Sequence, residues 1–142
     1  MSPKEYLQQV ARAERELETL RARVRHYESL GFSITSHTSD APVKASTPSS
    51  RVETAAVGIV DALSDIQGKM VAYNAIVKEA EKLIELVPQE NYRRILTLRY
   101  LCGHSFPTIS DEMKYTDRNS IYRAHGWALR EFGKVMRYAR QG

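Results

Sequence analysis

YRRILTLRYLCGHSFPTISDEMKYTDRNSIYRAHGWAL, residues 92–129, contains three short apolar patterns separated by two turn signals. In the first pattern the apolar residues recur at spacings of three and four, which predicts a helix over residues 89–101. Pro88 suits the start of this helix and Gly103 suits its end. The residues of its inner face are Tyr92, Ile95, Leu96, Leu98 and Leu101.

The second pattern predicts a helix of barely two turns after Ser105. The Ser105 hydroxyl can cap the first turn, where Pro107 is tolerated. Ile109 and Met113 are four residues apart and form the inward side of this helix. Lys114 stands where such turns often have glycine, so we expect a left-handed backbone conformation there.

The third pattern predicts a longer helix that begins after Thr116 or Asp117, either of which can accept hydrogen bonds from its first N–H groups. Its apolar residues share one face, with Leu129 beside them, and are Ile121, Ala124, Ala128 and Phe132. The opposite face carries Arg118, Asn119, Tyr122, Arg123 and Gly126.

Three short helices joined by tight turns are the layout of a helix-turn-helix DNA-binding unit. The outward residues suit base edges, because arginine can donate two bonds to guanine, asparagine can pair with adenine, and glycine leaves room for a sugar-phosphate backbone. The alternative is an ordinary solvated helix face. The residues that we expect to contact DNA are Lys114, Thr116, Arg118, Asn119, Tyr122, Arg123, Gly126, Arg130 and Arg137.

The charge is unevenly distributed between the two parts of the chain. Residues 89–142 carry ten Lys or Arg against five Asp or Glu, whereas residues 1–88 carry eleven against twelve. The basic excess therefore falls on the predicted DNA-binding unit, as phosphate contacts require. Toward the C-terminus, Arg130, Lys134, Arg137 and Arg140 suit either phosphate contacts or simple solubility.

This C-terminal part resembles region 4 of bacterial sigma factors, and the whole chain resembles the ArpU/RinA-like phage proteins that activate late operons. The resemblance implies that the third helix is the recognition helix, with Arg118, Asn119, Tyr122 and Arg123 on its reading side. It also implies RNA polymerase as a further partner. The residues that carry it are Tyr92, Leu96, Leu98, Arg99, Tyr100, Gly103, Ser105, Ile109, Met113, Tyr115, His125, Gly126, Ala128 and Leu129.

Two heptad seams occupy the N-terminal part of the chain, which predicts two long coiled-coil helices. Gly31 is expected to end the first helix. The first seam is Tyr6, Val10, Ala13, Leu17, Leu20, Val24 and Tyr27. The second seam is Val52, Ala55, Ile59, Leu63, Ile66, Met70, Tyr73, Val77, Ala80, Ile84 and Val87.

Residues 32–50 are rich in Ser and Thr, contain two prolines and lack an apolar period, so we expect a flexible linker there. The sequence thus predicts an all-α protein with a helical hairpin over residues 1–87 and a helix-turn-helix domain over residues 88–142. The seams can pair within the chain or against a second copy, with a dimer favoured. The expected oligomerisation residues are Leu17, Leu20, Val24, Ile59, Leu63, Ile66, Met70 and Tyr73.

The sequence offers little for catalysis or for a cofactor. Cys102, His104 and His125 match no structural zinc pattern, so we expect neither a metal nor another cofactor. Cys102 is expected to be buried, and His125 to be either a packed helix residue or a phosphate contact. Asp111 and Glu112 are adjacent and diverge on a helix, so one of them is expected to pair with Arg99.

The sequence is compatible with three functions. The first is a sequence-specific activator of phage late genes that binds double-stranded DNA in the bacterial cytoplasm. The second is a small terminase-like subunit for DNA packaging, and the third is a structural coiled-coil partner whose basic tail is incidental. None of them is an enzyme. No apolar run is long enough to span a bilayer, so no membrane association is expected.

Overall fold

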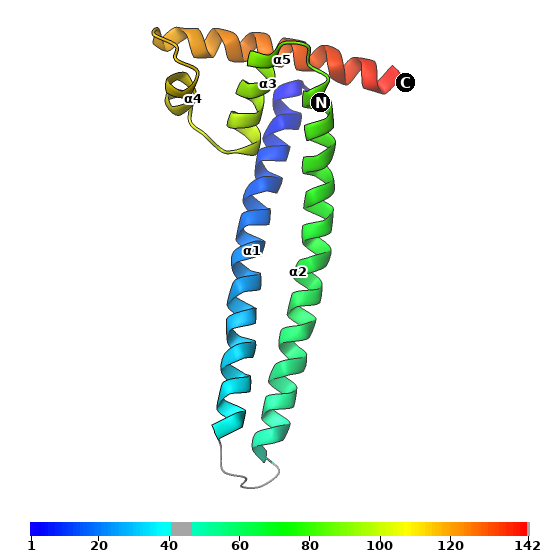
Figure 1. The fold of residues 1–142 in the computed structure, drawn as a ribbon. Helices are drawn as coiled ribbons and strands as arrows, with labels where there is room; N and C mark the ends of the chain where they lie inside the picture. Colours follow the sequence, from blue (N-terminus) through cyan, green and yellow to red (C-terminus); the bar gives the residue numbers. More distant parts are fainter. Residues whose placement is uncertain (41–46, 142) are drawn as a thin grey trace. The chain divides into compact units, whose positions relative to one another are not determined.

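The computed structural model describes residues 1–40 and 47–141, with side chains for residues 1–33 and 50–141. Its described residues form helices and no strand, which confirms the all-α prediction. None of these helices is both long and apolar enough to cross a membrane. The elements in chain order are α1 (Pro3–Asp40), α2 (Thr47–Glu85), α3 (Glu90–Leu96), the π-helical turn η1 (Thr97–Leu101), α4 (Phe106–Glu112) and α5 (Arg118–Gln141) (Figure 1).

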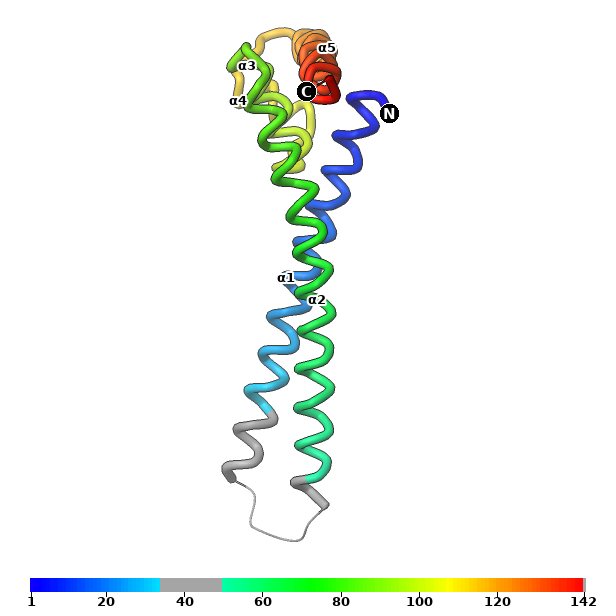
Figure 2. Tube along the Cα trace, turned by 90° about the vertical axis from the view of Figure 1, so that its right-hand side faces the viewer, coloured from blue at the N-terminus to red at the C-terminus, as the bar shows by residue number. Residues whose placement is uncertain are grey.

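α1 and α2 form the predicted helical hairpin (Figures 1 and 2). Their seams face inward, because the seam positions are buried or half-buried, apart from Ala55, which is exposed. This burial stabilises both helices, because an amphipathic helix draws most of its stability from packing and neither helix can bury its seam alone. The seam residues that are buried are Val10, Ala13, Leu17, Leu20, Ile66, Val77, Ala80, Ile84 and Val87.

The residues expected to mediate oligomerisation take part in packing within the chain. Leu17, Leu20 and Ile66 are buried in a single copy, with exposed fractions of 0–4%. The other five residues are half-buried. Three of those five, Val24, Leu63 and Met70, line an open groove of about 540 Å³ between the two helices. Contact of these residues with a second copy stays a prediction.

The predicted linker over residues 32–50 is wrong at both ends. α1 continues through Gly31 to Asp40, and α2 begins at Thr47; residues 41–46 lie outside the described residues. One glycine costs a helix about 1 kcal/mol, and each serine or threonine costs less. Extending an existing helix needs no new nucleus, so these costs do not stop it. The polar composition of residues 32–40 therefore does not indicate the end of a helix.

The chain divides into two compact units that differ from the predicted domains. One unit holds residues 1–15 and 74–142, and the other holds residues 16–73. The predicted boundary at residue 88 falls inside the first unit. There the Arg93 guanidinium donates hydrogen bonds to the carbonyl oxygens of Val87 (2.6 Å) and Pro88 (2.9 Å). This side chain satisfies carbonyls left free where α2 ends, and so joins α2 firmly to α3.

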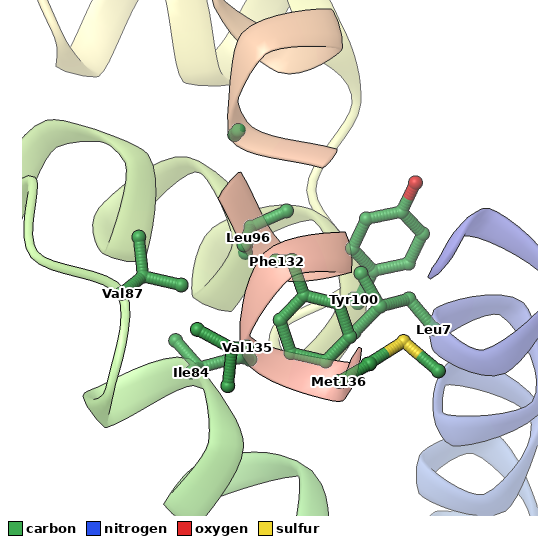
Figure 3. Packing of buried hydrophobic residues seen from close by; sticks show 9 residues of the cluster. Leu7, Ile84, Val87, Leu96, Tyr100, Phe132, Val135 and Met136 are labelled. Atoms are coloured by element: carbon green, nitrogen blue, oxygen red, sulfur yellow. The ribbon is translucent and has the colours of Figure 1, made fainter. Parts of the chain in front are cut away.

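The core of the first unit surrounds Phe132 on α5, which is fully buried. Side chains of α1, α2, α3 and η1 converge on it (Figure 3). The Tyr6 ring lies beside the Phe132 ring at a centroid distance of 5.8 Å. The buried members of this cluster are Leu7, Ile84, Val87, Leu96, Tyr100, Ala128, Phe132, Val135 and Met136.

A π-helical turn, η1, continues α3 and changes the phase of the helix. The Cys102 N–H donates to the Thr97 carbonyl five residues earlier, at 3.0 Å. Gly103 then ends the helix with a φ of 71°, as the sequence predicted. The wide turn places Tyr100 in the core, with 5% of its surface exposed.

Replacement of Phe132 by alanine tests whether this cluster holds the first unit together. We expect Phe132→Ala to lower the free energy of unfolding by about 3–5 kcal/mol, because it leaves a cavity among side chains from several helices. Tyr138→Ala on the same helix is the control: Tyr138 is 78% exposed, so the change should stay within about 0.5 kcal/mol. Guanidinium unfolding measures both. Equal losses in the two variants would contradict the assigned core.

Candidate nucleic-acid interface

The start of α4 is fixed by the predicted serine cap. The Ser105 hydroxyl oxygen accepts a hydrogen bond from the Thr108 N–H at 3.3 Å and lies 2.9 Å from the Thr108 hydroxyl. Pro107 lies in the first turn, where its missing N–H costs nothing. Ile109 is fully buried and Met113 half-buried, so the inward side of α4 is the predicted one.

The turn between α4 and α5 has the expected left-handed residue. Lys114 has a φ of 60°, and its N–H donates to the Asp111 carbonyl at 3.2 Å. The Tyr115 N–H donates to the Ser110 carbonyl at 3.0 Å. These bonds close the turn, so the chain leaves α4 in a fixed direction and enters α5 after two exposed residues, Thr116 and Asp117.

Asp117, rather than Thr116, caps α5. Its carboxylate accepts a hydrogen bond from the Asn119 N–H at 3.1 Å, and its carbonyl accepts one from the Ser120 N–H at 3.1 Å. The same carboxylate lies 3.6 Å from the Arg123 guanidinium, and both side chains are more than half exposed. An exposed ion pair of this kind contributes less than about 1 kcal/mol, so Arg123 can leave it for another anion at little cost.

A second apolar cluster holds the three short helices together. It joins α3, α4 and α5 through the buried residues Ile95, Ile109, Ile121 and Ala124. Four half-buried side chains pack around it: Leu98, Phe106, Met113 and Tyr115. The inward face of α5 is therefore the predicted one, and its outward face is fixed in direction by the same contacts.

The predicted DNA-contacting residues are all exposed, and most of them share one face of α5. At 100° per residue, five of them fall in a stripe about 60° wide, opposite the buried Ala128. Lys114 and Thr116 lie on the turn before the helix. Tyr122 lies beside the stripe, and Arg118 lies about a quarter turn from its edge. The five residues of this stripe, called the basic stripe below, are Asn119, Arg123, Gly126, Arg130 and Arg137.

Two aromatic residues beside the basic stripe were not among the predicted contacts. Trp127 is 50% exposed and Tyr138 is 78% exposed, which is unusual for rings of this size. Their signal in the sequence was the alternation of aromatic and basic residues along the outward side of the last helix. Lys134 also lies on this side, where its ammonium group pairs with Glu131 at 2.9 Å.

Gly126 has no packing reason to be a glycine. A Cβ built on Gly126 would meet no atom within 4 Å, whereas one built on Gly133 would lie 3.1 Å from the Pro3 side chain. Glycine inside a helix costs about 1 kcal/mol relative to alanine. At Gly133 the close approach of α1 accounts for that cost. At Gly126 no contact within the described residues accounts for the cost of a glycine.

One of the two roles predicted for His125, that of a packed helix residue, is confirmed. His125 is 8% exposed, and its Nε2 lies 2.8 Å from the Tyr100 hydroxyl in a hydrogen bond. Its ring also contacts the Phe106 ring edge-on, with the centroids 4.9 Å apart. Burial, with the cationic Arg99 and Lys4 nearby, lowers the pKa of His125 from 6.5 to about 4. The ring is therefore neutral near pH 7 and offers no positive charge to a phosphate.

Arg99 is held differently from the prediction. Its guanidinium donates a hydrogen bond to the His104 carbonyl at 3.1 Å and stacks over the Phe106 ring at 4.1 Å from the centroid. Of the two expected partners, Asp111 and Glu112, the carboxylate of Glu112 instead lies 3.7 Å from Nδ1 of His104. A carbonyl and an aromatic face thus take the place of the predicted carboxylate, because they lie at the start of α4 where the Arg99 side chain reaches.

Cys102 is exposed, so the prediction of burial is wrong. In a regular α-helix Cys102 would lie two turns after the buried Ile95 and share its face. A π-helical turn holds more residues than an α-helical turn, so the residues after it no longer share the face of Ile95. Cys102 is therefore rotated toward solvent. Within the described residues, no three His, Cys, Asp or Glu side chains gather in a way that could hold a metal ion.

Comparison with known proteins adds no relative: no family model, curated protein or solved structure matches this chain.

His125 should make the stability of the protein depend on pH. Its pKa is lower in the folded than in the unfolded chain, so between about pH 6.5 and 4 the unfolded chain binds more protons, and stability falls as the pH falls. The loss is about 3 kcal/mol at most. His125→Phe should remove this part of the pH dependence, whereas replacement of the exposed His26 by Phe should retain it. Chemical unfolding at pH 7 and pH 4.5 measures the difference, and identical pH dependence in both variants would contradict it.

Proposed function

We propose that this protein binds double-stranded DNA sequence-specifically and activates phage late genes. The observation that supports it is the basic stripe of α5, which is exposed while the other side of the same helix is buried. A recognition helix needs this combination: one face fixed in a core and the other free to enter a major groove. The role as an activator and the contact with RNA polymerase rest on the resemblance to sigma region 4 and to the ArpU/RinA-like proteins.

The first turns of α5 carry the side chains suited to base edges. Asn119 can pair with adenine through two hydrogen bonds, and Arg123 can do the same with guanine. Arg123 is paired with Asp117 only at the surface, so DNA can replace that partner. Asp117 itself would be repelled by phosphate, which favours placing the N-terminal turn toward bases rather than toward the backbone.

The later turns of α5 suit the sugar-phosphate backbone. Arg130 and Arg137 continue the basic stripe, and Lys134 lies beside it. Residues 89–142 carry five more basic than acidic side chains, which supplies the general attraction to DNA on which specific contacts build. Tyr138 and Trp127 can pack against sugars at the edge of this surface. The protein acts, in this proposal, as a binding protein and not as an enzyme.

Gly126 offers a test in which stability and DNA binding move in opposite directions. Gly126→Leu should raise the free energy of unfolding by about 0.5–1 kcal/mol, because leucine favours the helix and no atom lies within 4 Å of the added Cβ. The added side chain should lower affinity for every duplex at least tenfold, because it fills the space left for the DNA backbone. Gly58→Leu on α2 is the matched control, also without neighbours within 4 Å. Undiminished DNA affinity in Gly126→Leu would contradict the assigned face.

Two arginines separate specific from general DNA contacts. Arg123→Ala should cost about 1–3 kcal/mol of affinity on the specific site and little on scrambled DNA. Arg137→Ala should weaken binding to all sequences alike and reduce the slope of log affinity against log salt by about one unit. Both residues are exposed, so thermal unfolding should barely change.

The duplex for these titrations comes from selection of bound sequences out of a random pool. Enrichment of one sequence supports specific recognition. Failure of the wild-type protein to bind any duplex at low salt would overturn the proposal and leave the structural coiled-coil function. A ring of many subunits on light scattering would favour the terminase-like alternative instead.

A further inference from the structure

Two large aromatic side chains of α5 lie along one exposed line of this helix. Trp127 is 50% exposed and Tyr138 is 78% exposed. They are 11 positions apart, so helix geometry places them within about 20° of one direction and about 17 Å apart along the axis. The two buried clusters that hold α5 include neither ring. Trp127 and Tyr138 are called the aromatic row below.

A row of positive charge runs parallel to the aromatic row. Arg130 and Arg137 form the C-terminal half of the basic stripe, about 80° around the helix from the two rings. Lys134 lies between the rings, where its ammonium group pairs with Glu131 at 2.9 Å. The Lys134 side chain is 58% exposed, so it can exchange Glu131 for another anion at little cost. This side of α5 therefore offers flat rings along one line and cations along the next.

The charges between the two rings disfavour a protein as the partner of this surface. The core of a protein–protein interface is apolar and depleted in charged residues. On α5 the gap between the rings holds Lys134 and Glu131, and Arg130 lies beside it. The rings therefore cannot join into one apolar patch. Each ring suits a separate flat partner, with an anion between the two.

Unpaired bases fit the aromatic row better than a duplex does. The base faces of a duplex are stacked inside it, so a protein ring reaches only sugars and base edges. A single strand exposes the faces of its bases, and each base can stack on tryptophan or tyrosine whatever the sequence. At about 3.4 Å per stacked base, the distance between the two rings spans about five nucleotides.

We propose that α5 binds a single strand of nucleic acid, whose bases stack on Trp127 and Tyr138 and whose phosphates lie along Arg130 and Arg137. Proteins that bind single strands combine aromatic rings and positive charge in this way. The activity goes beyond the proposed recognition of duplex DNA, which uses base edges at the first turns of α5. The two activities share the arginines, whereas stacking on bases requires the rings.

The fluorescence of the full chain gives the first test, because Trp127 is its one tryptophan. A mixed-sequence DNA strand of about 15 nucleotides should quench the emission to a plateau, since a stacked base quenches an excited indole ring. The same strand annealed to its complement should quench less than half as much. Polyglutamate, an anion without bases, should leave the emission unchanged. Equal quenching by the duplex or by polyglutamate would contradict stacking on Trp127.

Variants of Tyr138 then separate stacking from charge, with the anisotropy of a labelled strand as the readout. Tyr138→Ala should weaken single-strand binding about tenfold and lower the ratio of single-strand to duplex affinity at least about fivefold. Tyr138→Phe should retain the affinity, because the ring remains. Arg137→Ala should weaken both forms alike and leave the ratio unchanged.

Phe32→Ala is the matched control for the aromatic row. Phe32 is 75% exposed but lies on α1, so its loss should change neither affinity. Circular dichroism verifies that each variant folds. An unchanged affinity ratio in Tyr138→Ala, or equal losses in Tyr138→Ala and Phe32→Ala, would refute the proposal.

The same titrations distinguish failure of this inference from failure of the proposed function. Binding of the duplex without the single strand overturns the inference alone, and binding of the single strand without the duplex overturns duplex recognition alone. Binding of neither overturns both. DNA and RNA strands present the same base faces, so parallel titrations with a DNA and an RNA strand of one sequence identify the preferred source.

Discussion

The burial of Phe132 is the contact on which the first unit depends. Its ring lies on α5 among side chains of α1, α2, α3 and η1, so one residue links the first and last helices of the chain. The smaller cluster around Ile109 and Ile121 then orients α4 on the same helix. Because the two clusters occupy one side of α5, the basic stripe is held outward by packing rather than by its own interactions.

Local signals in the sequence were enough for most of the fold. The seams predicted the inward sides of α1 and α2, since heptad spacing reports a packed face whatever the partner is. Ser105, Gly103 and Lys114 predicted the turns between α3, α4 and α5, because caps and left-handed residues act within a few residues of themselves. For the candidate site, the same periodicity predicted which side of α5 is exposed.

The features that the sequence did not predict depend on contacts between distant residues. Leu7 is fully buried although it lies outside the seam, because α5 covers it. The hydrogen bond between Tyr100 and His125 joins residues that lie 25 positions apart. The extension of α1 past Gly31 was missed for another reason: a single glycine is a weak stop signal when an established helix precedes it.

The π-helical turn at Thr97–Leu101 has a consequence for sequence alignment. Such a turn corresponds to one residue inserted into an α-helix, so the residues on its two sides keep different phases. A protein with the same packing but a regular helix would have one residue fewer here. An alignment without a gap would then pair Tyr100 with a residue that faces solvent. Searches for relatives of this chain should therefore permit a one-residue gap between Ile95 and Gly103.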